Sequence, residues 1–117
     1  RQDGEVASAA SRAEVVRTER LLKLRQLLAA HDTSMAALQR LNERLSLYRK
    51  QLLPQTAQAA EAALNAYTRD VGDFAEVVRA RIAELNARLA EIEIMAEQQK
   101  QVAQLNYLMT QVRQEEM

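Results

Sequence analysis

The chain has 117 residues, with 16 basic and 16 acidic side chains and a formal net charge of zero at pH 7. This balance provides no strongly basic face, so we expect no nucleic-acid partner. The absence of Cys excludes disulfides and thiolate metal ligands within the chain. Two Gly, one Pro and 3% aromatic residues are too few for a thick compact core. Ala, Leu, Gln, Glu and Arg dominate instead, and they favour long helices.

The first predicted element is a helix over about residues 5–67. Its apolar side chains recur every three or four residues, which is typical of a coiled coil. They are Leu21, Leu24, Leu28, Met35, Leu38, Leu41, Leu45, Tyr48 and Leu52, followed by Ala59, Ala63 and Ala66. Pro54 lacks an amide hydrogen and clashes with the preceding turn, so we expect a kink there. Residues 31–34 offer a cap for a new helix, but the apolar stripe continues through them, which favours an unbroken helix.

A turn is predicted at residues 68–73, where the helical pattern stops. Gly72 can adopt a left-handed conformation without steric cost, and Asp70 tolerates that conformation better than most residues. Asp73, with Glu76 three positions later, matches a capping box for the next helix. The carboxylate of Asp73 also suits the positive end of the helix dipole.

The second predicted helix spans about residues 73–114. Its stripe comprises Phe74, Val78, Ile82, Leu85, Leu89, Ile92 and Ala96, and then shifts phase to Val102, Leu105, Met109 and Val112. Such a shift near Gln99 indicates a stutter, which locally unwinds a supercoil.

These elements predict an all-α fold, a long antiparallel coiled-coil hairpin that forms a single helical domain over residues 1–117. If residues 66 and 75 face each other, Leu52 lies opposite Leu89 and Leu45 lies opposite Ala96. Six stripe residues are expected to be buried between the helices: Leu38, Leu45, Leu52, Ile82, Leu85 and Leu89. About 26 residues of the first helix, roughly 40 Å, then have no partner within the chain. We expect the chain to self-associate into a bundle, most simply as a dimer, and so bury Leu21, Leu24 and Leu28.

Few residues suggest chemistry. His31 is the only His and has no ligand cluster around it, so we predict a seam or surface residue and no metal site. Met35, Met95 and Met109 lie at or near stripe positions, which favours packing over binding of a soft metal. No nucleophile–base constellation or phosphate-binding loop is present, so we expect neither enzymatic activity nor a cofactor. The sequence has no run of about 18 apolar residues and no signal peptide. Since it begins at Arg1, we expect it to be part of a longer protein.

The segment LLPQTAQAAEAALNAYTRDVGDFAEVVRARIAELNARL, residues 52–89, resembles the tip hairpin of the outer membrane efflux protein family, the TolC-like trimeric channels of Gram-negative bacteria. Leu52-Leu53-Pro54, the small residues after it and Tyr67 match the family's first helix. The Gly72-Asp73-Phe74 turn and the Arg-rich start that follows most resemble the heavy-metal, CzcC-like subgroup. The resemblance extends more weakly to residues 5–51 and to Tyr107-Leu108.

The resemblance implies one hairpin of a periplasmic α-helical tunnel, to which each of three subunits contributes four helices. The tunnel hangs from an outer-membrane β-barrel that lies elsewhere in the parent protein. A periplasmic adaptor and an inner-membrane pump are the implied partners. The turn would then be the periplasmic tip, acting as gate or adaptor-docking site through Tyr67, Arg69, Asp70, Gly72, Asp73, Glu76 and Arg79.

Two positions depart from the family pattern. Asp70 stands where the family usually has Gly, and Arg79 replaces the second member of an acidic pair. A gate built from two acidic residues per subunit therefore rests on Glu76 alone. Two other functions remain open: a generic dimerising coiled coil, and the α-hairpin of a periplasmic adaptor protein. No adaptor-like tip pattern of Arg, Leu and Ser is evident around residues 66–76.

Overall fold

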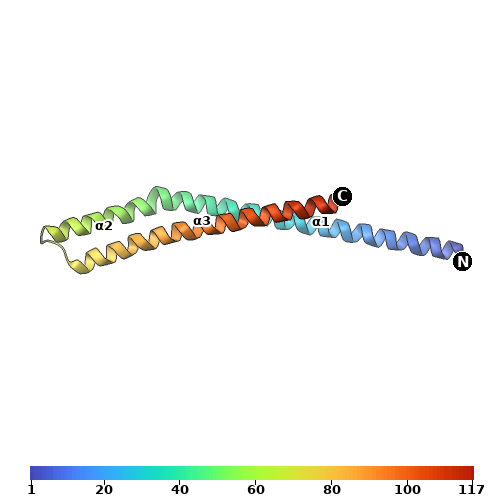
Figure 1. The fold of residues 1–117 in the computed structure, drawn as a ribbon, viewed down its shortest axis with the longest axis horizontal. Coiled ribbons are helices and arrows are strands. Elements are labelled where there is room, and N and C mark those ends of the chain that lie inside the picture. Colours follow the sequence, from blue (N-terminus) through green and yellow to red (C-terminus); the bar gives the residue numbers. More distant parts are fainter. The chain divides into compact units, whose positions relative to one another are not determined.

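The computed structural model describes residues 1–117, which form helices and no strand. Helix α1 spans Gln2–Leu47, the π-helical segment η1 spans Tyr48–Leu52, and α2 spans Leu53–Thr68. Helix α3 spans Phe74–Glu116 (Figure 1). The all-α fold expected from the sequence is therefore confirmed, with two long helical arms joined by one turn. Helix α1 continues without a break through residues 31–34.

The chain divides into two compact units. The terminal unit contains Arg1–Ala36 and Val102–Met117, and the turn unit contains Ala37–Gln101. Each unit holds part of both helical arms, and each is described by itself.

Two polar contacts define how the arms of the turn unit pair. The Nε of Arg49 donates to Oε2 of Glu91 at 2.9 Å, and the Nε2 of Gln98 donates to Oδ1 of Asn42 at 2.6 Å. Residue numbers rise along one arm as they fall along the other, so the arms are antiparallel. The predicted register would place Asn42 opposite residue 99, so the observed register differs from it by one residue.

The seam of α3 has a different rotation from the predicted one. Its buried residues in the turn unit are Val77, Glu84, Ala87 and Ile94, which repeat with a seven-residue period. The side chains predicted to be buried are instead exposed: Ile82 by 52%, Leu85 by 60% and Leu89 by 54%. That prediction was wrong because α3 carries two stripes. The one with the larger side chains faces away from the partner arm.

The seam of the other arm passes through η1. Leu45 is buried, as predicted, and Leu38 and Leu52 are half-buried. The next buried residue is Ala60, with none of its surface exposed, whereas the predicted Ala59 is exposed. A regular repeat of two heptads from Leu45 would place the next buried residue at position 59. The buried residue is at position 60, so η1 inserts one extra residue between the two seam positions. The amide of Leu53 donates to the carbonyl of Tyr48, five residues earlier, as in a π-helix.

Pro54 explains the position of η1. A proline in an α-helix has no amide hydrogen for the carbonyl four residues earlier, and its ring crowds that carbonyl. The wider π-helical turn lies immediately before Pro54, and π-bulges are a recognised cause of helix kinks. The ribbon bends between α1 and α2 (Figure 1), where the sequence predicted a kink.

In the terminal unit, Leu108 and Val112 are buried on α3, and Ser34 is buried on α1. The Nζ of Lys23 lies 3.6 Å from a carboxylate oxygen of Glu115. Residues 1–23 are all exposed, as expected for the unpaired end of the first helix. Leu108 and Ile94 are two heptads apart on α3, so the predicted stutter near Gln99 is absent from the seam.

Candidate functional site at the helical turn

The end of α2 is closed by two backbone hydrogen bonds. The amide of Val71 donates to the carbonyl of Ala66 at 3.0 Å, and the amide of Asp70 donates to the carbonyl of Tyr67 at 3.1 Å. This pair of bonds is the Schellman motif, whose penultimate residue adopts a left-handed conformation. Asp70 does so here, with φ of 60°. Of the two residues that the sequence offered for the left-handed conformation, Asp70 and Gly72, it is therefore Asp70 that adopts it.

Gly72 is required for a different reason, which is close approach. No glycine in the chain has a positive φ. A Cβ atom at position 72 would lie 2.8 Å from Cβ of Ala66 and 2.9 Å from the amide nitrogen of Tyr67. Since real Cβ atoms do not approach other heavy atoms this closely, the returning chain passes over the end of α2 only with Gly at this position.

Asp73 caps α3, as the sequence predicted. Its Oδ1 accepts a hydrogen bond from the amide of Ala75 at 3.2 Å, and its carbonyl accepts one from the amide of Glu76 at 3.1 Å. The other half of the capping box does not form. Glu76 instead pairs with Arg79, one turn further along the same helix. Asp73 therefore provides the N-cap, and Glu76 is neutralised locally.

Two aromatic rings and an aliphatic side chain form the exposed surface of the turn. The rings of Tyr67 and Phe74 lie 5.6 Å apart at an interplanar angle of 57°, a favourable tilted arrangement. They are 44% and 60% exposed, and Val71 between them is 80% exposed. Apolar groups this exposed at the only non-helical backbone between the arms provide a surface that a partner can cover.

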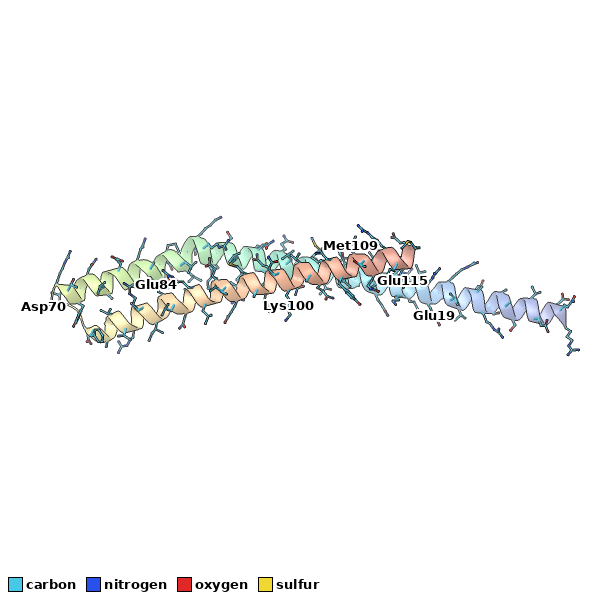
Figure 2. The ribbon with its side chains drawn as sticks, viewed as in Figure 1. Glu19, Asp70, Glu84, Lys100, Met109 and Glu115 are labelled. Carbon is cyan, nitrogen blue, oxygen red and sulfur yellow. The ribbon has the colours of Figure 1, made fainter.

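The turn thus contains all seven residues predicted for the site within Tyr67–Arg79. Gly72 and Asp73 have structural roles, and Glu76 and Arg79 pair with each other. Arg69 and Asp70 form no ion pair within the chain, and the carboxylate of Asp73 bonds only an amide. Their charges are available to a partner. Figure 2 shows Asp70 at the end of the hairpin.

Sequence reasoning missed a second polar feature, inside the seam. Glu84 is only 7% exposed and lies between α2 and α3 (Figure 2). One of its carboxylate oxygens is 3.4 Å from a guanidinium nitrogen of Arg81 and 3.7 Å from one of Arg88. The signal was present as Glu84, Glu91 and Gln98 at a strict seven-residue spacing. The prediction of the seam considered aliphatic side chains and left these polar residues out.

The other chemistry candidates have ordinary positions. His31 lies half-buried in α1, and its Nδ1 is 3.7 Å from Asp32. The structure holds no group of three His, Cys, Asp or Glu side chains that could bind a metal ion. Met35, Met95 and Met109, predicted to pack in the stripe, are each more than 40% exposed. The Sδ of Met95 accepts a hydrogen bond from Arg49 at 3.4 Å.

No helix is both long enough and apolar enough to span a bilayer. Neither a family model, nor a curated protein, nor a solved structure matches the chain.

Proposed function

We propose that the chain is a tunnel hairpin of a trimeric outer-membrane efflux channel in a Gram-negative bacterium. In this proposal it belongs to a tripartite pump that exports heavy metals or drugs. Its turn is the periplasmic tip that meets the adaptor protein. The proposal rests on the resemblance of residues 52–89 to the TolC-like tip hairpin and on one structural observation, the two-sided character of α3.

Helix α3 has apolar side chains on two separate faces in the turn unit. At about 100° per residue, the seam through Val77, Ala87 and Ile94 is centred roughly 150° from the exposed stripe through Leu85 and Leu89. A two-stranded coiled coil requires only one such face. A helix in a curved wall has a neighbour on each side, and a second apolar face on α3 provides the contact with one of them. In a regular ring of twelve helices, the number implied by the resemblance, those neighbours are about 150° apart when each helix packs through two faces.

The turn is consistent with this role. Its backbone is fixed by the Schellman bonds of α2 and by the Asp73 cap, so the exposed groups are held in place. Val71, Tyr67 and Phe74 present apolar surface, and Arg69 and Asp70 present unpaired charges. A compact patch with an apolar centre and charged edges suits a docking contact with an adaptor.

The test is photocrosslinking in cells that produce the full-length protein and its adaptor. A photoreactive amino acid replaces Val71 in one variant and Val6 in the control, since Val6 is 69% exposed but far from the turn in sequence. The proposal expects an outer-membrane protein whose residue 71, and not residue 6, crosslinks to the adaptor. Crosslinks from residue 71 only between copies, or a cytosolic location, would favour the generic coiled coil. A location at the inner membrane with crosslinks to a channel would favour the adaptor hairpin.

A further inference from the structure

The exposed apolar stripe of α3 is not used by the hairpin. This α3 stripe consists of Val78, Ile82, Leu85, Leu89 and Ile92, which are 40% to 61% exposed. Their spacing of four, three, four and three residues places them in one line along the helix. Most of the large aliphatic side chains of α3 in the turn unit therefore face solvent. The seam holds Ile94 and Val77 beside the smaller or polar Ala80, Glu84 and Ala87.

The partner arm of the turn unit offers no equivalent stripe. Its outward positions carry Gln39, Glu43, Lys50, Gln58, Glu61 and Asn65, which are all exposed. Leu47 is the one large aliphatic residue exposed there, at 47%. The only apolar line in the turn unit that can cover an α3 stripe is therefore another α3 stripe.

We propose that the α3 stripe binds the same stripe of a second copy of this chain, with the two α3 helices parallel and in register. Ile82 and Leu89 of each copy then occupy one of the two core positions of the seven-residue repeat between the copies. Val78, Leu85 and Ile92 occupy the other core position. This is the seven-residue pattern of a two-stranded coiled coil. The inference concerns the isolated chain, in which no neighbouring tunnel helix covers the α3 stripe, and it does not rest on the proposed channel function.

The exposed area is of the size that a dimer needs. The five side chains of the α3 stripe together expose on the order of 500 Å² per copy, close to the upper range for the largest patch of a monomer. Two such surfaces bury roughly 1,000 Å², the lower limit for a specific interface between proteins. The α3 stripe runs about 21 Å along the helix at 1.5 Å per residue, so its contact is continuous.

The charges along the two edges of the α3 stripe decide the orientation. One edge carries Arg81 and Arg88, and the other carries Arg79, Asn86 and Glu93. In an antiparallel pair each edge faces itself, which sets Arg88 against an arginine of the second copy. The other edge would then set Arg79 against Glu93, but Arg79 already pairs with Glu76 of its own chain. In a parallel pair the edges alternate, and Arg88 approaches Glu93 of the other copy at the spacing used by coiled coils. Glu93 forms no ion pair within its own chain, so it is available for this contact.

Sedimentation equilibrium of the 117-residue chain tests whether the α3 stripe is the dimer interface. The variant Leu85→Gln/Leu89→Gln removes the centre of the α3 stripe. The matched control, Leu22→Gln/Leu28→Gln, changes two α1 leucines that are 51% and 48% exposed. Gln is a good helix former, and circular dichroism confirms that each variant keeps its helices. The proposal expects a dimer whose dissociation constant rises roughly tenfold or more in the stripe variant and less than about threefold in the control.

Three results would overturn the proposal. The first is a monomer at every concentration. The second is an equal effect of the two double variants, and the third is a larger effect of the control, which would place the contact on the unpaired end of α1. Loss of helix in the stripe variant would also count against the α3 stripe being a free surface, because exposed leucines are not needed for the hairpin.

Disulfide crosslinking tests the orientation, and the absence of Cys from the chain makes it specific. Leu89→Cys is expected to crosslink to itself on mild oxidation, whereas Ala83→Cys, which is exposed but off the α3 stripe, is not. If a mixture of Leu85→Cys and Leu89→Cys chains gave mainly mixed dimers while neither crosslinked alone, the pair would be antiparallel and the parallel proposal would be wrong.

Discussion

Asp70 and Gly72 divide two tasks that a single glycine often performs at the end of a helix. Asp70 takes the left-handed conformation that closes α2, and Gly72 allows the chain to pass Ala66. The family pattern that the sequence resembles has Gly at position 70, which is the residue type that this conformation prefers. The sequence offered both residues for the left-handed conformation but did not indicate the close approach at Gly72. Propensity indicates which residues tolerate a left-handed φ, while the observed hydrogen bonds determine which one adopts it.

Asp70→Gly is expected to stabilise the chain, because it removes the steric cost of a left-handed side-chain residue. The gain is about 0.5–1 kcal/mol after the greater flexibility of Gly in the unfolded state is subtracted. Gly72→Ala is expected to destabilise it by about 1–3 kcal/mol through the contact with Ala66. Urea unfolding at one fixed protein concentration measures both changes. A loss of stability in Asp70→Gly would contradict the left-handed role of Asp70, and no loss in Gly72→Ala would contradict the close approach at Gly72.

Glu84 is the buried charge of the seam, held by two arginines that are themselves largely exposed. Burying a carboxylate costs free energy that such pairs recover only in part. Glu84→Leu is therefore expected to raise the free energy of unfolding by about 1 kcal/mol or more, measured by urea unfolding. Glu84→Gln, which keeps the shape, serves as the control and is expected to change it little. A large loss of stability in Glu84→Leu would show that the ion pairs are essential to the hairpin.

At the scale of the elements, much of the fold could be predicted from the sequence. Helix-forming composition, the polar turn and the Asp73 cap located both arms, and the facing of residues 66 and 75 gave a register within one residue. The rotation of α3 could not be predicted. Periodicity shows that a helix has an apolar face but does not show which of two faces the partner covers. The larger side chains of Ile82, Leu85 and Leu89 favoured the wrong face.

The extra residue that η1 inserts into the seam also could not be predicted from the apolar pattern of the sequence. Pro54 indicated an irregularity but not its kind, because a kink and a π-bulge both relieve the missing hydrogen bond. Only the burial of Ala60 in place of Ala59 shows that a residue has been inserted into the seam. For the candidate site, the residues of the turn could be predicted from the sequence, but the pairing of Glu76 with Arg79 appears only in the structure.

The insertion gives a prediction about chain length. Deleting Lys50 together with Pro54→Ala should convert η1 into a regular α-helix that keeps Leu45, Leu53 and Ala60 on one seam. We expect a free energy of unfolding within about 1 kcal/mol of that of the unmodified chain, because Ala also removes the cost of placing Pro in a helix. Deletion of Gln39 with the same Pro54→Ala change is the control. It rotates one side of the seam by about 100° and should lower the midpoint of thermal unfolding markedly. Equal effects of the two deletions would contradict the role assigned to η1.

At the scale of the whole molecule, the two-sided α3 and the capped, exposed turn together support a hairpin that works within a larger helical assembly. The turn brings Asp73, Glu76 and Arg79 close to one another. Under the proposed channel function, repetition of this cluster around a three-fold axis would bring like charges together, and pairing in one state with exposure in another would provide a two-state gate. The alternative is that these residues only cap and neutralise the start of α3.

The most direct measurement is the conductance of the full-length protein in lipid bilayers, with efflux from cells measured in parallel, for Asp73→Asn and Glu76→Gln. Asn is as good an N-cap as Asp, so Asp73→Asn removes the charge and keeps the cap. Asp73→Ala, which removes both and should cost about 1 kcal/mol of stability, separates the two roles. A functional tip predicts altered conductance or efflux in Asp73→Asn and Glu76→Gln with little change in stability. Wild-type conductance and efflux in both charge variants, or no channel activity in the full-length protein, would contradict the account.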